Sequence, residues 1–324
     1  MPFIRRFEIV SICVFIIISG CSDPQSEESK EGDMSGFFMG MKPSSTPQLL
    51  APNLLASSMD EYNSTFSPDG TEFFFTSYLH PNLGIISYTR MNEDGSWIKP
   101  QVASFSGEFS EYDPLFSPDG KRLYFSSERP SPVDSMIKTR IWFSEKIDGA
   151  WAEPVLAIED SSGVYHSSVT NKGDIYLNIW DTGDMYKAAQ SDSGYVISRL
   201  DSVLSTNNSE ADPYISPYED YLIFRGYNDS YGRGDMYITY NIDGKWSKPQ
   251  NLGEPINSSS HEMCPIVSPD GKFFLWSSGR KLTDTRTEAG TELSEIRTSA
   301  NSHDNGRMNL YYISADFIEE MRPE

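Results

Sequence analysis

The chain of 324 residues repeats one short motif five times at intervals of close to fifty residues. The clearest copy is Glu-Tyr-Asp-Pro-Leu-Phe-Ser-Pro-Asp-Gly at residues 111–120, and the others span residues 61–70, 164–173, 210–217 and 261–271. The steps between equivalent positions are 50, 53, 46 and 52 residues, counted at Pro68, Pro118, Asn171, Pro217 and Pro269. Short strands repeated with this period indicate the blades of a β-propeller or a related array.

Each repeat unit predicts four strands. The inner strand carries the motif, and an unbroken apolar run such as Leu123-Tyr124-Phe125 follows its turn, as expected for a strand covered on both faces. A third strand, such as residues 140–144, leads to an Asp-Gly hairpin turn at 94–95, 148–149 and 243–244. The outer strand then opens with Trp and has Pro three residues later. Proline is tolerated on an edge strand, so this strand is predicted at the blade rim.

The two ends of the repeat region complete each other. Residues 309–313 form a predicted third strand that no Trp-x-x-Pro strand follows, whereas residues 47–50 match the outer-strand sequence at 249–252. We therefore predict an all-β fold: a five-bladed β-propeller of four-stranded blades. Its ring is closed by an N-terminal strand that completes the last blade and leaves no long unpaired edge.

The motif at residues 111–127 resembles the WD-like propeller repeat of the TolB family. The resemblance covers the chain from about residue 47, although the third copy has lost Pro-Asp and the fourth has lost Asp-Gly. It implies the propeller but not the role of TolB in cell-envelope assembly. The same repeat occurs in protein-binding modules and in some polysaccharide lyases, so the fold by itself does not define a function.

The first twenty residues have the features of an export signal. Arg5 and Arg6 precede the apolar run 9–18, which is too short to span a membrane. Residues 18–21, Ile-Ser-Gly-Cys, resemble the bacterial lipobox, which implies cleavage before Cys21 and lipidation of its thiol. The alternative is an ordinary signal peptide in which Cys21 is incidental. We expect a lipoprotein signal peptide at 1–20, a flexible acidic tether at 21–46 and the propeller at 47–324.

The expected cellular location follows from the same N-terminal segment. Ser22, with no Asp directly after the cysteine, fits outer-membrane sorting by the enterobacterial rule, and the acidic tether loosely resembles surface-export tethers. The anchor at Cys21 would hold an exported lipoprotein on the periplasmic or the surface side. Cys264 is then the single cysteine of the mature domain, so no intrachain disulfide can form, and we interpret it as a small buried hydrophobic residue.

Composition excludes several functions. Hydrophobic residues make up 38% of the chain, which excludes a wholly disordered protein. Asp and Glu outnumber Lys and Arg by 47 to 26, and a net charge of −21 opposes binding to nucleic acid. Motifs for a serine hydrolase, a zinc protease, a phosphate loop or a calcium loop are absent from the sequence. We predict no cofactor, no metal site and a monomer.

Strand order predicts where a site would lie. The starts of the inner strands and the loops after the second strands share one face around the axis, opposite the Ser-Pro-Asp-Gly turns. The ligand-binding candidates there are His166, Trp180, His261, Glu262, Arg129 and Arg280. Four of them break the repeat, namely His166, Trp180, His261 and Arg280. Asp113 and Asp212, each followed by proline, are interpreted as structural ties to backbone amides or a neighbouring arginine. The segment 279–307 falls outside the repeat and is predicted to be disordered or a lid.

Two functions remain open from the sequence. The first is a lipid-anchored envelope propeller that binds a peptide, protein or saccharide at its axial funnel without chemistry. The alternative is a carbohydrate-active propeller, either a glycoside hydrolase or a polysaccharide lyase, that uses the axial carboxylates Asp113, Asp212 and Glu262. Carboxylates paired to arginine or backbone amides would favour the binding protein, and two uncompensated carboxylates in an open cleft would favour the enzyme.

Overall fold

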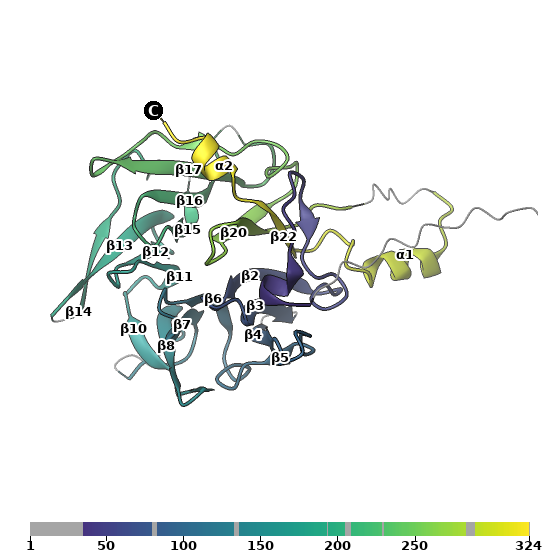
Figure 1. The fold of residues 1–324 in the computed structure, drawn as a ribbon, viewed down its shortest axis with the longest axis horizontal. Coiled ribbons are helices and arrows are strands. Elements are labelled where there is room, and N and C mark those ends of the chain that lie inside the picture. The colour runs from purple at the N-terminus through teal and green to yellow at the C-terminus, as the bar shows by residue number, and fades with distance from the viewer. Residues whose placement is uncertain are drawn as a thin grey trace, which may run out of the picture. The chain divides into compact units, whose positions relative to one another are not determined.

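The computed structural model describes residues 35–79, 83–132, 136–192, 194–204, 209–228, 230–282 and 289–323. These residues form an all-β five-bladed propeller, in which the inner strands of the five sheets surround the centre (Figure 1). The predicted signal peptide, Cys21 and His80 lie outside the described residues, and so does the tether up to residue 34. No helix in the described part of the chain is long and apolar enough to cross a membrane.

Blades 1 to 3 follow one another along the chain from the inner to the outer strand. Blade 1 contains β2 (Asp60–Phe66), β3 (Glu72–Leu79), β4 (Leu83–Arg90) and β5 (Gln101–Val102). Blade 2 contains β6 (Glu111–Phe116), β7 (Arg122–Ser127), β8 (Arg140–Ile147) and β10 (Val155–Ile158), with β9 (Ala150–Trp151) also paired to β8. Blade 3 contains β11 (Val164–Val169), β12 (Ile175–Ile179), β13 (Asp184–Ser191) and β14 (Gly194–Arg199).

Blades 4 and 5 complete the ring. Blade 4 contains β15 (Ala211–Ile215), β16 (Tyr221–Gly226) and β17 (Asp235–Ile242), to which both β18 (Lys245–Trp246) and β19 (Gln250–Asn251) pair. Blade 5 contains β20 (Glu262–Val267), β21 (Phe273–Ser278), β22 (Asn309–Ser314) and β1 (Gln48–Leu49). The remaining elements are the short turn η1 (Phe37–Gly40) and the helices α1 (Leu293–Ala300) and α2 (Phe317–Glu320).

The predicted closure of the ring is confirmed. Strand β1 is antiparallel to β22, with Gln48 opposite Tyr312 and Leu49 opposite Tyr311. The backbone N–H of Leu50 continues the ladder by donating to the carbonyl of Leu310 at 2.8 Å. The outer strand of blade 5 therefore comes from the opposite end of the sequence, and β22 has no free edge.

The core lies between the blades. Second strands are apolar without alternation because both of their faces are covered, as the sequence predicts. Phe74 of blade 1 is fully buried and contacts Phe116 and Trp151 of blade 2, with ring centroids 5.5 and 5.7 Å away. The tryptophan after each Asp-Gly turn therefore serves to fill the space between one blade and its neighbour.

The described end of the predicted tether is attached to blade 1. The N–H of Phe38 donates to the carbonyl of Gly70 at 3.0 Å, and the indole N–H of Trp97 donates to the carbonyl of Gly36 at 3.0 Å. The Phe38 ring lies so close to Gly70 that a side chain at that turn would collide with it. Met39 is buried beside these residues. Packed residues therefore begin upstream of residue 47.

The segment outside the repeat, residues 279–307, is described except for residues 283–288. It contains α1, whose side chains are not buried. Its C-terminal end is tied to blade 1, because the amide of Asn305 donates to the carbonyl of Ser58 at 3.2 Å and Arg307 pairs with Asp60 at 3.4 Å. Whether this segment acts as a lid stays a prediction.

Candidate functional site: a polar cluster on the propeller axis

All five inner strands contain a bulge at the same position. Pairing with the second strand shifts register there in β2, β6, β11, β15 and β20. One residue of each bulge has left-handed backbone, with φ between 42° and 59°, namely Asn63, Asp113, His166, Asp212 and Cys264. Because these residues are separated by the repeat steps, each blade contributes one side chain to the same level of the axis.

The preceding blade holds most of these bulges in place. The N–H of Asp113 donates to Thr76 Oγ1 at 3.2 Å, and the N–H of His166 donates to Ser126 Oγ at 2.9 Å. Asn178 Oδ1 and Ser277 Oγ accept from the N–H groups of Asp212 and Asn63 in the same way. The bulge leaves one backbone N–H without a partner in the ladder. A polar side chain on the second strand of the preceding blade accepts its hydrogen bond.

The five side chains converge, and four of them share polar contacts. Asn63 Nδ2 lies 2.8 Å from Asp113 Oδ1 and 3.1 Å from His166 Nδ1. His166 Nδ1 is also 3.7 Å from Asp113 Oδ1 and 4.0 Å from Asp212 Oδ1. Since Asn63 belongs to blade 1 and His166 to blade 3, these contacts cross the axis. All five residues are buried, with at most 7% of their surface exposed.

Arg225 replaces the small polar residue in blade 4. It occupies the second-strand position held elsewhere by Thr76, Ser126, Asn178 and Ser277, and its Nε donates to Asp212 Oδ2 at 2.8 Å. Its Nη1 lies against the Tyr227 hydroxyl and 3.3 Å from His261 Nε2. The N–H of Cys264 turns to Asp212 Oδ2 instead, at 3.4 Å.

Charge and burial shift the pKa values of several residues in and beside this cluster. Burial by itself would raise the pKa of Asp212, but the positive charges of Arg225 and His166 outweigh it and the pKa is lowered. Burial opposes protonation of His166, yet the neighbouring carboxylates of Asp113 and Asp212 raise its pKa. Burial and the charge of Arg225 together lower the pKa of His261. The axis thus favours an ionised Asp212 and a neutral His261.

Aromatic side chains lie beside the cluster. Tyr165, the residue before His166, stacks on Trp180 with ring centroids 4.2 Å apart and planes 25° apart, and Trp180 is 58% exposed. Tyr227 is 39% exposed, and the Arg225 guanidinium lies 5.5 Å from its ring centroid. Exposed rings beside an arginine and a histidine offer a ligand both flat apolar surface and hydrogen-bonding groups.

The structure separates the predicted site residues into two groups. His166, His261, Asp113 and Asp212 belong to the axial cluster, and Trp180 joins it through Tyr165. The contacts of Asp113 and Asp212 are those of the structural ties expected from the sequence.

Arg129, Arg280 and Glu262 form clamps within blades 2 and 5. Arg129 donates to Ser127 Oγ at 3.1 Å and pairs with Glu111 at 2.5 Å. Arg280 donates to Ser278 Oγ at 3.0 Å and pairs with Glu262 at 3.3 Å. Both arginines also donate to backbone carbonyls of the loop before the inner strand. These three candidates are therefore engaged by their own blades.

Sequence reasoning missed Arg225, Asn63 and the position of Cys264. Arg225 carried a usable signal, because aligning the second strands sets one arginine against two serines, a threonine and an asparagine. Cys264 carried none, because its neighbours in sequence are apolar and its polar neighbours come from other blades.

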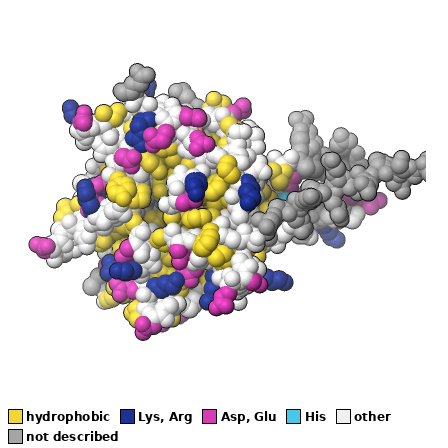
Figure 2. Space-filling view, in the orientation of Figure 1, with side chains coloured by type: hydrophobic (Ala, Val, Ile, Leu, Met, Phe, Trp, Pro, Cys, Tyr) yellow, Lys and Arg dark blue, Asp and Glu magenta, His cyan; other side chains and the backbone are white. Residues whose placement is uncertain are grey.

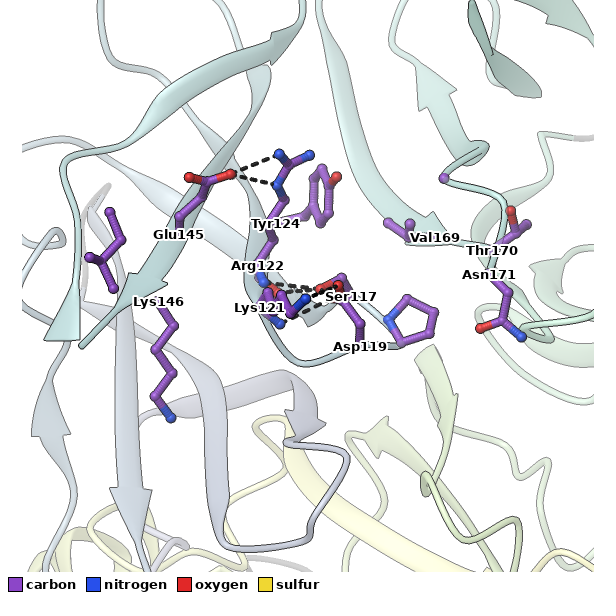
Figure 3. Close-up of a pocket in the computed structure, with 13 residues that line it drawn as sticks. Ser117, Asp119, Lys121, Arg122, Tyr124, Glu145, Lys146, Val169, Thr170 and Asn171 are labelled. Atoms are coloured by element: carbon purple, nitrogen blue, oxygen red, sulfur yellow. Dashed lines mark hydrogen bonds and ion pairs between the residues drawn. The ribbon is translucent and has the colours of Figure 1, made fainter. Parts of the chain in front are cut away.

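Two cavities lie near the ends of the inner strands that are farther from the candidate site, on the side of the Ser-Pro-Asp-Gly turns. One of about 280 Å³ is lined by all five blades, including the residues two positions after each bulge, Thr65, Leu115, Ser168, Tyr214 and Ile266. The face of the molecule in Figure 2 shows hydrophobic side chains in its middle and charged side chains of both signs around them. A second cavity of about 380 Å³ lies between blades 2 and 3, where Arg122 is already paired with Glu145 at 2.7 Å (Figure 3).

Comparison with known proteins assigns the chain to no family. No protein-family model matches the chain, and no curated protein matches it significantly. Similar solved structures include a TolB-like protein from Agrobacterium tumefaciens, with 16% identity, a TM-score of 0.49 and coverage of 79% of this chain and 90% of that chain. Another is an endo-arabinase from Bacteroides thetaiotaomicron, with 13% identity, a TM-score of 0.46 and coverage of 72% and 94%. At identities and TM-scores this low, the function of these proteins does not carry over to this chain.

Proposed function

We propose that the protein binds a peptide, protein or saccharide ligand on the face of the propeller where the inner strands begin, and that it does so without catalysis. The observation that carries this proposal is the state of the two axial carboxylates. Asp113 accepts from the Asn63 amide, the Ser126 hydroxyl and the N–H of His166. Asp212 accepts from Arg225 and from the N–H of Cys264.

A glycosidase needs two carboxyl groups that face the scissile bond, one of them free to transfer a proton. Asp113 and Asp212 are buried, and both oxygens of Asp113 and Oδ2 of Asp212 accept from the protein's own donors. Glu262 is buried in its clamp with Arg280. The groups left for a ligand are aromatic, cationic or neutral. This arrangement favours recognition over acid–base chemistry.

The exposed rings define how the ligand would be held. Trp180 on Tyr165, together with Tyr227, provides flat surfaces that suit a sugar face or an aromatic or proline side chain. Arg225 and His261 supply hydrogen bonds at the axis itself. We further propose that the propeller acts as a lipoprotein anchored through Cys21, since the basic residues, the apolar run and the lipobox agree.

Capture of glycans and of envelope-extract peptides by the full-length protein, purified in detergent, tests the proposal. The double substitution Trp180→Ala and Tyr227→Ala should weaken capture at least about tenfold, because it removes the exposed rings. Tyr218→Ala is the matched control, since this tyrosine is 83% exposed but lies at the other end of the axis. Equal loss in both variants would show that the site is elsewhere.

A turnover assay separates the two functions considered from the sequence. Captured glycans incubated with the protein should be recovered intact. Asp113→Asn with Glu262→Gln should leave any trace turnover unchanged. If turnover is seen and this variant abolishes it with folding retained, the carbohydrate-active alternative replaces the binding proposal.

A further inference from the structure

We propose that the axial cluster is a metal site, in which Asp113, His166 and Cys264 bind one divalent transition-metal ion, with Zn²⁺ as the best fit. One ligand atom from each residue lies within 4.8 Å of the other two, and all three residues are buried. This inference revises the sequence-based expectation of no metal. The three residues come from blades 2, 3 and 5, so only the closed ring brings them together.

The spacing of the oxygen and nitrogen donors is that of a tetrahedral site, and the sulfur of Cys264 lies within 4.8 Å of both. Zinc bonds of about 2.0 Å to nitrogen and oxygen and about 2.3 Å to sulfur place ligand atoms roughly 3 to 4 Å apart. Asp113 Oδ1 and His166 Nδ1 are 3.7 Å apart. Asp212 Oδ1, 4.0 Å from the same nitrogen, or a water molecule would take the fourth position.

The chemistry of the donors selects the class of metal. A thiolate, an imidazole nitrogen and a carboxylate together suit a borderline-soft ion, whereas calcium and magnesium prefer oxygen ligands alone. Zinc with the Cys264 thiolate and the Asp113 carboxylate carries no net charge. Asp212 is already neutralised by Arg225 at 2.8 Å. The buried axis can therefore hold the ion without an uncompensated charge. Binding through Nδ1 requires a neutral His166, so it releases to solvent the thiol proton of Cys264 and any proton on that nitrogen.

The Asn63 amide competes for the same space. Its Nδ2 donates to Asp113 Oδ1 at 2.8 Å and lies 3.1 Å from His166 Nδ1, so it occupies the two atoms that would bind the metal. Metal binding requires this side chain to rotate away. The backbone does not need to move, because the bulges of Asp113 and His166 are each held by a hydroxyl group of the preceding blade. Replacing Asn63 by Ala should therefore retain metal binding.

Titration of the chelator-treated, full-length protein with Zn²⁺ and with Co²⁺ tests the proposal. One equivalent of either ion should bind, and Co²⁺ should produce the thiolate charge-transfer band and the intense visible bands of a tetrahedral cysteine complex. Cys264→Ser should remove the charge-transfer band. His166→Ala should weaken affinity at least about 100-fold, since loss of even a supporting residue around a metal costs 10- to 100-fold.

Matched variants decide the outcome. His303→Ala removes a histidine of the segment outside the repeat and should leave affinity unchanged. Melting curves without metal identify any variant that fails to fold. In that case the Co²⁺ spectrum of the wild-type protein decides, because a one-to-one complex without a thiolate band overturns the proposal. The proposal is also overturned if the wild-type protein does not bind one equivalent of metal, or if Cys264→Ser and His166→Ala both bind the metal as tightly as the wild type.

Discussion

At the scale of single residues, the axis depends on an ion pair that most of the repeat lacks. Four blades satisfy the bulge N–H of the next blade with a side-chain hydroxyl or amide oxygen. In blade 4 that position holds Arg225, which cannot accept a hydrogen bond and requires a carboxylate nearby. Asp212 supplies it and at the same time accepts from the N–H of Cys264. The side chains of Arg225 and Asp212 are largely withdrawn from water, with 13% and 4% of their surface exposed. Loss of either partner therefore leaves a buried charge without compensation.

Removing one member of this pair should be costly. We expect Asp212→Asn to lower the free energy of unfolding by about 3 kcal/mol, because Arg225 stays buried without its carboxylate. Urea unfolding at neutral pH measures the effect. The double variant Asp212→Asn with Arg225→Met should recover part of the loss, since neither charge remains. A double variant less stable than Asp212→Asn would contradict this account of the pair.

At the scale of elements, the inner strands of blades 1, 2 and 5 begin with an equivalent buried glutamate. In blades 2 and 5 the loop after the second strand supplies an arginine, Arg129 or Arg280. In blade 1 the corresponding residue is Leu79, and Glu61 is held by the hydroxyl and N–H of Ser57. Burial raises the pKa of Glu61 to about 7, which the hydrogen bonds from Ser57 only partly oppose and Asp60 increases.

The raised pKa of Glu61 should make the free energy of unfolding depend on pH. The folded protein binds the Glu61 proton more tightly than the unfolded chain, where the pKa is 4.5, so stability falls as pH rises from about 4.5 to about 7. The loss over this interval is about 3 kcal/mol. Denaturant unfolding across this range should show a flatter pH dependence for Glu61→Gln than for wild type. Glu93→Gln, at an exposed glutamate of the same blade, should retain the wild-type dependence; a dependence unchanged in Glu61→Gln would exclude Glu61 as its source.

At the scale of the whole molecule, the fold is held closed by a short strand. Strand β1 itself contributes two ladder pairs to β22, from Gln48 and Leu49, and the N–H of Leu50 adds a further hydrogen bond to Leu310. The side chain of Leu50 is almost fully buried in the cluster that joins blades 1, 4 and 5. Closure therefore depends more on the burial of this side chain than on the two residue pairs of the ladder. Every contact across the axis depends in turn on this closure.

Leu50→Ala should lower the free energy of unfolding by about 3 kcal/mol, from lost burial and the cavity left behind. Val102→Ala is the matched control, because Val102 lies on the outer strand of blade 1 and is 49% exposed. That variant should stay within about 0.5 kcal/mol of wild type. Thermal and denaturant unfolding measure both. If both substitutions lower the free energy of unfolding by similar amounts, the closing strand contributes no more to stability than an ordinary outer strand.

The architecture could be predicted because its signals are local and recur. Apolar second strands such as Leu123-Tyr124-Phe125, Asp-Gly turns and edge prolines each report on a few neighbouring residues, and the repeat at near fifty residues places them in register. Residues 47–50 could be matched to blade 5 because they resemble the outer strand of blade 4. The structure confirms five blades and the closing strand on these grounds.

The candidate site was predictable only in part. His166 and His261 break the repeat and could be selected for that reason, and they lie in or beside the axial cluster. Arg280 breaks it equally well, yet this arginine, like the candidate Arg129, is engaged by a glutamate of its own blade. Sequence distinguishes a side chain that differs from its counterparts, but not whether a neighbouring blade or a ligand uses that difference.

The sequence by itself determined the number of blades, their strand order and the join between the two ends, because these follow from local propensity and a repeated register. Only the tertiary structure decided which side chains meet. The left-handed bulge that turns Asn63, Asp113, His166, Asp212 and Cys264 to one level could not be read from the sequence, since four different residue types occupy its five positions. Their separations of a few ångströms arise across a closed ring, between residues that lie about fifty or more positions apart in the chain.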